Sequence, residues 1–352
     1  MKQTEIFNVD PVSPQPELIY QAAEILKRGG LVAFPTETVY GVGAVINDDM
    51  AIERLRHLKQ RDEEKKFSVC IYSVEQAEEL CGVLSPFTYR LIEKFWPGPL
   101  TLVVPSHNGG MVGLRMPDHP VAQQLLRQVN IPLFAPSAKF SGKTPPASAR
   151  EVISELGGLI DAVLDAGRTK LGIGSTVCRV VDGEYVILRP GTVTADMIEP
   201  AARNKSILFV CTGNSCRSAM AEGLMRKMLA DVPDIGVSSA GVGTFDGMPA
   251  SRTAQLVMQR QGIDISRHRS RRITETMVRE SDLILVMEDS HRRYIVDRFP
   301  YAEKRTLLLK EFSGEETADL DIADPIGMDE TFYEEVLQEI KKSVEGVVLK
   351  LR

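Results

Sequence analysis

The sequence has few cysteines and no long apolar runs. Only 5 of its 352 residues are cysteine, a sparse and odd number that argues against a disulfide-stabilised fold and for a reducing compartment. Its longest apolar stretches, such as Ile207–Cys211 and Leu283–Met287, have the length of strands, whereas a bilayer-spanning helix needs about 20 residues. The first ten residues lack the basic end and apolar core of a secretory signal. We therefore expect a cytoplasmic protein.

The sequence also lacks an excess of basic charge. Residues 1–200 carry 20 Lys+Arg and 24 Asp+Glu, and residues 201–352 carry 22 and 24, so neither half favours broad nucleic-acid binding. Residues 101–150 differ, with one acid, Asp118, and five basic residues: Arg115, Arg127, Lys139, Lys143 and Arg150. Such a segment suits a local anion pocket, although a solvated run of charges explains it equally well.

Walker, GxGxxG and Cys/His metal-ligand patterns are absent from the sequence, so we expect no metal bound by protein ligands alone. At about 150 residues per domain, the length predicts two domains. The polar segment Glu199–Lys205 is the best boundary candidate. We place the domain boundary near residue 203, between domains 1–200 and 204–352.

Both domains have an α/β pattern. In the first, helical and strand segments alternate, and Asp182-Gly183 separates two strand segments as in a hairpin, which predicts a mixed sheet. In the second, strands and helices alternate strictly from Ile207–Val210 to a final helix that begins near Thr331. This pattern predicts a doubly wound parallel sheet.

The most specific motif is VCTGNSCRS, residues Val210–Ser218, which follows a buried strand and opens a helix. Five residues separate Cys211 from Arg217, so a tight loop can bring both side chains to one tetrahedral anion, with loop amides pointing at it. We expect this positive field to lower the pKa of Cys211. Arg217 can hold two phosphate oxygens, and Ser218 can donate to the thiolate. Gly213 and Asn214 suit left-handed conformations.

Together with later segments, this motif resembles the low-molecular-weight protein-tyrosine-phosphatase family over about residues 205–352. The later segments are SSAG (238–241), GIDISRHRSRRIT (262–274), LILVMEDSHRR (283–293) and ADPIG (323–327). The resemblance implies a phosphate loop that also includes Thr212 and Ser215. It makes Cys211 the nucleophile, Arg217 the phosphate ligand and Asp324 the general acid and base. Cys216 would trap oxidised Cys211 as a disulfide.

The substrate of this half stays open. Phosphotyrosine is the family default, yet Ile326 stands where relatives carry an aromatic residue after Asp-Pro. Ser215 is small and polar, which resembles the protein-arginine-phosphatase branch. Thiol-coupled arsenate reductases need further cysteines downstream, and the sequence has none after Cys216. A phosphoprotein, with phosphotyrosine or phosphoarginine, is therefore the expected substrate.

Candidate ligand residues of the first half are dispersed over several loops. PTETVYGVGA (35–44) supplies Thr36, and Lys59-Gln60-Arg61 puts two cations on one side of an extended chain. Three further loops follow: PSAKFSGKTPP (136–146) with Ser137 and Lys139, GSTV (174–177) with Ser175, and LRPG (188–191) with Arg189.

With FWPGPLT (95–101) and LRMPDHP (114–120), these loops resemble the YrdC-type threonylcarbamoyl-AMP synthase family over about residues 10–195. The resemblance implies condensation of L-threonine, bicarbonate and ATP, with Mg²⁺ accompanying ATP, and a product passed to tRNA-modifying machinery. Thr36, Arg115, Ser137 and Ser175 would then line the threonine side. The cations Lys59, Arg61 and Arg189 would contact phosphates or adenylate.

One departure from this family is Lys139, since its loop normally reads Ser-Ala-Asn. Lysine is a flexible, donor-only cation, which can add a phosphate ligand or mark a pocket that no longer makes product. The main hypothesis is therefore a bifunctional enzyme. A second makes the first half a silent nucleotide- or RNA-binding module, double-stranded RNA included, that regulates the phosphatase. A third treats Cys211 and Cys216 mainly as a redox switch.

Overall fold

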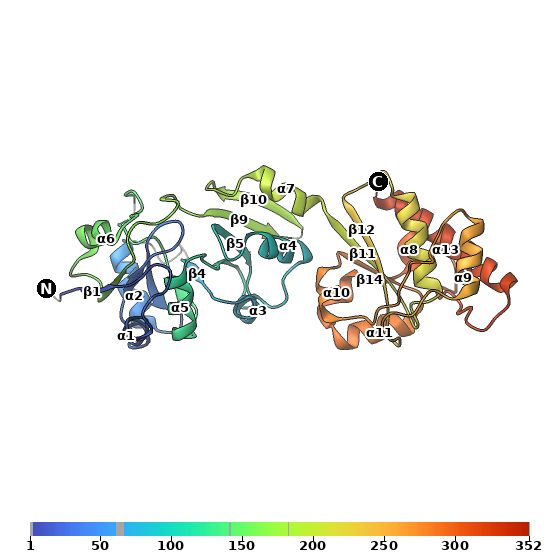
Figure 1. Cartoon of the computed structure of the whole chain (residues 1–352), viewed down its shortest axis with the longest axis horizontal. Helices are drawn as coiled ribbons and strands as arrows, with labels where there is room; N and C mark the ends of the chain where they lie inside the picture. The colour runs from blue at the N-terminus through green and yellow to red at the C-terminus, as the bar shows by residue number, and fades with distance from the viewer. Residues whose placement is uncertain (1–2, 61–66, 141, 182, 352) are drawn as a thin grey trace. The chain divides into compact units, whose positions relative to one another are not determined.

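The computed structural model describes residues 3–60, 67–140, 142–181 and 183–351, and Figure 1 shows the arrangement of its helices and strands. The chain divides into two compact units, Met1–Glu199 and Pro200–Arg352. Each unit is an α/β structure, as predicted, and each is described here by itself.

The first unit is built on one mixed ten-stranded sheet of order β1-β8-β2-β3-β7-β4-β6-β5-β9-β10. Its strands are β1 (Glu5–Asn8), β2 (Val32–Phe34), β3 (Gly41–Val45), β4 (Ser68–Cys70), β5 (Leu100–Pro105), β6 (Met111–Arg115), β7 (Leu133–Phe134), β8 (Ala162–Asp165), β9 (Thr176–Val181) and β10 (Glu184–Arg189). Its helices are α1 (Pro16–Lys27), α2 (Asp49–Lys59), α3 (Val74–Cys81), α4 (Pro86–Phe95), α5 (Pro120–Val129) and α6 (Ala149–Leu156), followed by α7 (Ala195–Arg203), which runs into the second unit.

Alternate residues of β2 face two hydrophobic cores. Val32 and Phe34 pack with residues of α1 and α5, whereas Ala33 packs with residues of α2 and α6. A strand that is buried on both faces reads as a continuous apolar run, which is the pattern of Leu31–Phe34. The sheet is mixed at this strand, because β2 pairs parallel with β8 and antiparallel with β3.

Several elements of this unit were not expected from the sequence. Most of strand β3 lies within PTETVYGVGA (35–44), a segment that the sequence predicted to be a ligand loop. The structure explains Gly43 by close packing: a Cβ there would lie 3.0 Å from a ring carbon of Phe34. The expected boundary segment Glu199–Lys205 is also mostly helical, since it falls on α7 and the first residue of the next strand.

The second unit has a four-stranded, all-parallel sheet of order β12-β11-β13-β14, which confirms the predicted doubly wound fold. Its strands are β11 (Lys205–Cys211), β12 (Ile235–Gly241), β13 (Leu283–Val286) and β14 (Thr306–Leu308). Its helices are α8 (Arg217–Met228), α9 (Arg252–Arg260), α10 (Glu275–Glu280), α11 (Asp289–Arg298), the 3₁₀ helix η1 (Pro300–Arg305), α12 (Leu309–Ser313) and α13 (Glu330–Leu351).

Strand β11 is the central strand that leads into the phosphate loop. Ile207 and Phe209 pack on one face with residues of α8, α9 and α13, and Leu208 and Val210 pack on the other with residues of α10 and α11 (Figure 1). Cys211 ends β11 and Arg217 begins α8. The loop between them therefore lies at the carboxyl end of the sheet, at the point where the strand order reverses, which is where doubly wound folds bind ligands.

Candidate active sites

The loop from Cys211 to Arg217 folds tightly around the Cys211 sulfur. The Asn214 backbone N–H donates to Cys211 Sγ at 3.3 Å, and Ser218 Oγ lies 3.0 Å from the same sulfur. Asn214 has a φ of 50°, so it adopts the left-handed conformation that the sequence predicted. Gly213 is not among the described residues with positive φ, and that part of the expectation is wrong.

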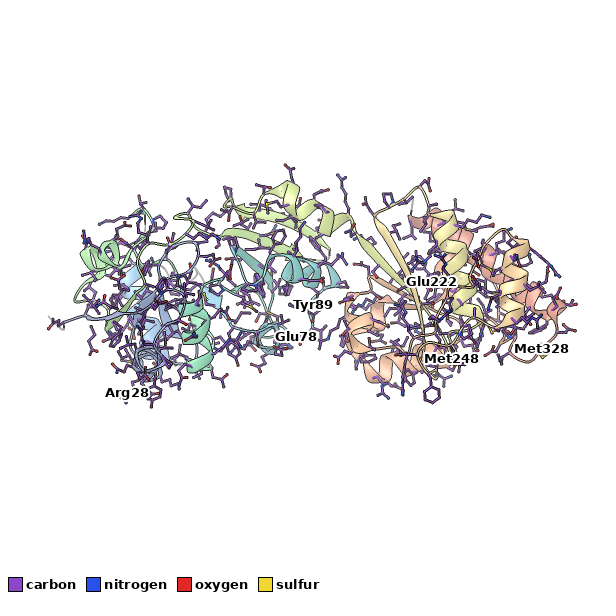
Figure 2. The ribbon with its side chains drawn as sticks, in the orientation of Figure 1. Arg28, Glu78, Tyr89, Glu222, Met248 and Met328 are labelled. Atoms are coloured by element: carbon purple, nitrogen blue, oxygen red, sulfur yellow. The ribbon has the colours of Figure 1, made fainter. Side chains whose placement is uncertain are left out.

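Asn214 ties this loop to the rest of the unit through its buried side chain. Its Nδ2 donates to Ser218 Oγ at 2.9 Å and to Ser239 Oγ at 2.8 Å, and its Oδ1 accepts from the Arg271 backbone N–H at 2.8 Å. Ser239 donates in turn to Glu222 on α8, which Figure 2 labels. The loop is therefore held rigid by hydrogen bonds that lie behind the pocket.

The expected lowering of the Cys211 pKa is not what the structure gives. Burial raises the pKa of this thiol, while hydrogen bonds from Ser218 and Asn214 and the charge of Arg217 lower it, and burial prevails. Only 2% of Cys211 is exposed, and removal from water disfavours the charged form. The donors at the loop are present as predicted, but they do not outweigh burial.

Two carboxylates orient the buried guanidinium of Arg217. Its NH2 donates to Asp324, and its NH1 donates to Glu288 and, at 2.7 Å, to the carbonyl of Ile322. Burial raises the pKa of Glu288, but the contact with Arg217 together with His291 and Ser290 outweighs burial and leaves that pKa lowered. The Nε–H of Arg217 has no hydrogen-bond partner in the part of the chain that the structure describes. This buried donor remains available to an anion.

Replacing Glu288 by Gln is expected to lower kcat/KM for an aryl phosphate by about tenfold or more. Charge-assisted hydrogen bonds contribute about 1.5–3 kcal/mol, and without this one Arg217 is less well oriented for the transition state. Steady-state kinetics measure the effect, with Glu334→Gln on the exposed face of α13 as the matched control. Equal activity of the two variants would show that Glu288 does not position Arg217.

The pocket above the loop has a volume of about 130 Å³. That is below the range of about 300–1,000 Å³ that is usual for whole small-molecule ligands, so it suits one phosphoryl group. Of the residues predicted for this site, Asn214 and Ser218 lie behind the pocket, and the others line it together with Ile326: Cys211, Thr212, Gly213, Ser215, Cys216, Arg217 and Asp324. Their chemical roles stay predictions.

A larger cavity of about 790 Å³ lies in the first unit. Arg61 lies outside the described residues, and every other residue predicted for this half lines the cavity: Thr36, Lys59, Arg115, Ser137, Lys139, Ser175 and Arg189. Segments from dispersed loops therefore meet at one place, and the volume suits a nucleotide-sized ligand.

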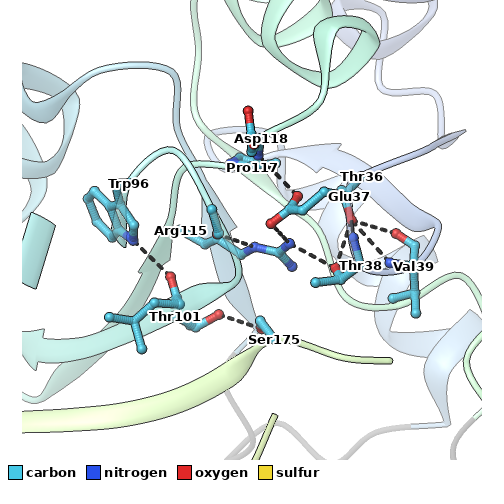
Figure 3. A network of polar contacts seen from close by, with 12 residues as sticks. Thr36, Glu37, Thr38, Val39, Trp96, Thr101, Arg115, Pro117, Asp118 and Ser175 are labelled. Atoms are coloured by element: carbon cyan, nitrogen blue, oxygen red, sulfur yellow. Dashed lines mark hydrogen bonds and ion pairs between the residues drawn. The ribbon is translucent and has the colours of Figure 1, made fainter. Parts of the chain in front are cut away.

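Arg115 and Glu37 form a buried ion pair beside this cavity (Figure 3). Arg115 NH2 donates to Glu37 at 2.7 Å and to Thr38 Oγ1 at 2.8 Å, and Glu37 also accepts from the Asp118 backbone N–H at 3.0 Å. Glu37 was not predicted. The hydroxyl of Thr36 donates to the Val39 carbonyl at 2.7 Å, so it holds the turn of this loop.

Ser175 joins two strands at another wall of the cavity. Its Oγ lies 2.8 Å from Thr101 Oγ1 on β5, a partner that the sequence did not predict (Figure 3). Arg189 at the end of β10 donates to the Ser175 carbonyl at 2.7 Å and to its hydroxyl at 3.1 Å. Both predicted side chains are thus fixed by hydrogen bonds at the cavity.

The expected extended geometry of Lys59-Gln60-Arg61 is wrong for the two described residues. Lys59 is the last residue of α2, and Gln60 is a left-handed C-cap with a φ of 45°. The Lys59 Nζ donates to the carbonyls of Ser137, at 2.8 Å, and Lys139, and so orders the next loop. The Lys139 Nζ donates to the Lys143 carbonyl. The described lining of the cavity contains four basic side chains, of which Arg115 pairs with Glu37; the others are Lys59, Lys139 and Arg189.

Other polar pairs of this unit lie away from the cavity and serve packing. Tyr89 on α4 donates to Glu78 on α3, two side chains that Figure 2 labels. The Trp96 indole donates to the Leu100 carbonyl at 2.8 Å and so stabilises the turn of the FWPGPLT segment.

The described residues hold no cluster of three or more metal-ligating side chains, and the residues that line the larger cavity include no carboxylate. These residues do not fit a metal held by protein ligands alone. None of the described helices is both long and apolar enough to cross a membrane.

Fold and site together define a two-domain α/β protein that combines a cationic, nucleotide-sized cavity with a cysteine phosphate loop. Two family models match it: the Sua5/YciO/YrdC model described as "Telomere recombination" at residues 24–191, and "Low molecular weight phosphotyrosine protein phosphatase" at residues 206–352. The chain belongs to the threonylcarbamoyl-AMP synthase family over its first part and to the low-molecular-weight phosphatase family over its second.

Curated relatives match the two parts separately. The threonylcarbamoyl-AMP synthase of Bacillus subtilis is 38% identical over 200 residues, 54% of this chain and 58% of that protein. A Mycobacterium tuberculosis protein assigned to the same synthase family is 37% identical over 94% of its length. The "Probable low molecular weight protein-tyrosine-phosphatase EpsP" of Ralstonia nicotianae is 40% identical over 42% of this chain and 97% of that protein.

A solved structure supports the fold of the first part. A variant of Pyrococcus abyssi Sua5 matches with a TM-score of 0.54 and 31% identity, over 74% of this chain and 90% of that one. The chain spans 58% and 66% of the synthases of B. subtilis and P. abyssi that it matches.

Proposed function

We propose that the chain is a bifunctional enzyme. Its first unit condenses L-threonine, bicarbonate and ATP into threonylcarbamoyl-AMP and pyrophosphate, and the product passes to tRNA-modifying machinery that makes N6-threonylcarbamoyladenosine. Its second unit hydrolyses protein phosphotyrosine through a phosphocysteine intermediate. The observation that supports the proposal is that the described residues predicted for the first half, and all but Asn214 and Ser218 of those predicted for the second, line one cavity in their own half.

In the second unit, Cys211 Sγ attacks phosphorus, and the bond from phosphorus to the leaving oxygen breaks. Asp324 gives that oxygen a proton, while Arg217 and the loop amides balance the charge of the phosphoryl oxygens. Asp324 then takes a proton from water, which attacks the phosphocysteine, and the P–S bond breaks to release phosphate and the Cys211 thiolate. The contact between Arg217 and Asp324 keeps these two groups at the same pocket.

In the first unit, Lys59, Lys139 and Arg189 of the cavity lining supply charge for ATP phosphates. Mg²⁺ would accompany the ATP phosphates, which supply the oxygen ligands that this ion prefers. The fixed hydroxyl of Ser175 and the buried Arg115 offer directed polar contacts for threonine and its carbamate. The chain's own part is to bind and orient the reactants, so that the carbamate oxygen meets the α-phosphorus of ATP.

Replacing Lys139 by Ala should raise the KM for ATP about tenfold or more and keep kcat within about twofold. A charged donor to phosphate contributes about 1.5–3 kcal/mol of binding. The measurement is threonine-dependent pyrophosphate release. Lys143→Ala is the matched control, because Lys143 lies in the same loop but does not line the cavity. An unchanged KM would exclude Lys139 as a nucleotide ligand.

A second candidate activity is hydrolysis of protein phosphoarginine. Ser215 lines the phosphate pocket. Its small side chain leaves room for a planar guanidinium, and its hydroxyl oxygen can accept a hydrogen bond from that group. Ile326 at the same pocket is 61% exposed and offers no aromatic face to a substrate ring.

Side-by-side hydrolysis of phosphotyrosine and phosphoarginine peptides compares the two activities. Ser215→Ile should lower phosphoarginine hydrolysis about tenfold more than phosphotyrosine hydrolysis. The substitution removes a hydrogen-bond acceptor for the substrate guanidinium and puts a larger side chain in its place, and it leaves the rest of the pocket intact. Each substrate serves as the control for the other. Equal losses on both would remove the argument for phosphoarginine.

A further inference from the structure

Three hydroxyl groups from different parts of the second unit surround the sulfur of Cys216. Tyr333 Oη, from α13, lies 3.2 Å from Cys216 Sγ. Ser251 Oγ, at the N-cap of α9, lies 3.3 Å away, and Ser215 Oγ lies 3.6 Å away. Cys216 and Tyr333 are 4% and 2% exposed. Buried polar groups are usually hydrogen-bonded, so these contacts give the buried thiol and phenol their partners.

Three of these groups form a closed ring of hydrogen bonds. The Cys216 S–H donates to Ser251 Oγ, and Ser251 Oγ–H donates to Tyr333 Oη at 3.3 Å. The Tyr333 O–H then points to Cys216 Sγ. Burial, and next the contact with Cys216, raise the pKa of the Tyr333 phenol to about 12, so Tyr333 stays a donor at neutral pH.

Hydrolysis itself does not use this ring. Tyr333 and Ser251 do not line the phosphate pocket, whereas Cys216 does. Cys216 therefore connects the ring to the pocket that contains the Cys211 nucleophile. A hydroxyl that donates a hydrogen bond to Cys216 therefore affects the reactivity of this second thiol.

We propose that Tyr333 is a positioning residue for the Cys216 thiolate, stabilising the sulfur anion that attacks oxidised Cys211 and so setting how fast the Cys211–Cys216 disulfide forms. The inference rests on the proposed function, since Cys211 must be the reactive thiolate. Hydroxyl donors favour the charged form of an acceptor, and thiolate is the attacking species in disulfide formation.

The oxidant in this step is a hydroperoxide. Cys211 thiolate gives two electrons to hydrogen peroxide, which yields the sulfenic acid and hydroxide. Cys216 loses a proton and its thiolate attacks the Cys211 sulfur, so the S–S bond forms, the S–O bond breaks and the hydroxide that leaves takes up the proton to become water. A dithiol then reduces the disulfide and restores both thiols. Without fast trapping, a second peroxide oxidises Cys211 to the sulfinic acid.

Peroxide treatment of the full chain tests the proposal, with peptide mass spectrometry of the Cys211 and Cys216 peptides and recovery of activity by dithiothreitol. Tyr333→Phe should leave kcat and KM for an aryl phosphate within about twofold, slow disulfide formation about tenfold and increase the sulfinic acid. Tyr294→Phe on α11 is the matched control and should behave like the unchanged chain. Unchanged disulfide formation in Tyr333→Phe, or an equal fall in hydrolysis, would overturn the proposal.

A second measurement separates this proposal from the proposed function. In a Cys211→Ser background, Tyr333→Phe should slow iodoacetamide alkylation of Cys216 at pH 7 several-fold. The alkylation is followed by mass spectrometry of the Cys216 peptide, so the assay needs no phosphatase activity. If Tyr333→Phe does not fold, Ser251→Ala is the second variant: it removes the acceptor of the Cys216 S–H and keeps the Tyr333 donor, so it should speed alkylation instead. Unchanged alkylation contradicts the role of the ring even if the phosphatase is active, and slowed alkylation in Tyr333→Phe supports it even if phosphotyrosine is not the substrate.

Discussion

Replacing Cys211 by Ser is expected to lower aryl-phosphate hydrolysis by at least about 10⁴-fold, because loss of a catalytic nucleophile removes most of the rate acceleration of covalent catalysis. Serine keeps the size of the side chain, but its hydroxyl is a far weaker nucleophile than a thiolate. The contacts of Asn214 and Ser218 around this position allow serine to be accommodated, so the loop should stay folded.

This variant should keep the full activity of the first unit, measured as threonine-dependent pyrophosphate release. The matched control is Cys81→Ser, which changes a half-buried thiol in the first unit and should leave both activities unchanged. Hydrolysis that persists in Cys211→Ser would refute the nucleophile assignment and favour a mainly redox role for Cys211 and Cys216.

Replacing Arg115 by Ala is expected to abolish pyrophosphate release, with a loss of at least about 100-fold, and to destabilise the first unit. Arg115 forms a buried ion pair with Glu37, with side-chain exposures of 9% for Arg115 and 6% for Glu37. Removing one partner of such a pair costs about 3–5 kcal/mol, because it leaves the other charge buried and unpaired. Glu37 also accepts from the Asp118 amide, so the turn that lines the cavity should lose its shape.

Thermal unfolding and pyrophosphate release measure the two effects of this change, and aryl-phosphate hydrolysis by the same sample checks that the second unit is intact. Arg127→Ala is the matched control, since Arg127 lies on the surface of α5 over the Tyr72 ring. Normal pyrophosphate release by Arg115→Ala would show that this ion pair serves neither binding nor the shape of the cavity.

The residues of the phosphate loop could be predicted from the sequence because they are contiguous. Cys211, Arg217 and the turn between them are fixed by a strand, a short loop and a helix start, and the structure places them accordingly. Their partners could not be predicted in this way. Glu288 meets Arg217 across 71 residues and Tyr333 meets Cys216 across 117, contacts that only the packing of α11 and α13 on the sheet creates.

In the first unit, too, the sequence predicted the residues of the site but not the partners that packing brings to them. The dispersed loops were assigned through resemblance to a family, and the structure brings their described residues to one cavity. Glu37 stands between Thr36 and Thr38 in an otherwise ordinary motif, and only the approach of Arg115, 78 residues later, makes it part of a buried pair. The lowered pKa of Cys211 failed as a prediction because the sequence shows the donors of the loop but not the depth of burial.

The most direct test of the bifunctional account is pyrophosphate release from ATP and Mg²⁺ by the intact chain, measured with L-threonine and bicarbonate together and with each of them left out. The account predicts release that requires both threonine and bicarbonate and that persists in Cys211→Ser. No release, or release that does not depend on threonine, would contradict it and leave the first unit as a nucleotide- or RNA-binding module attached to a phosphatase.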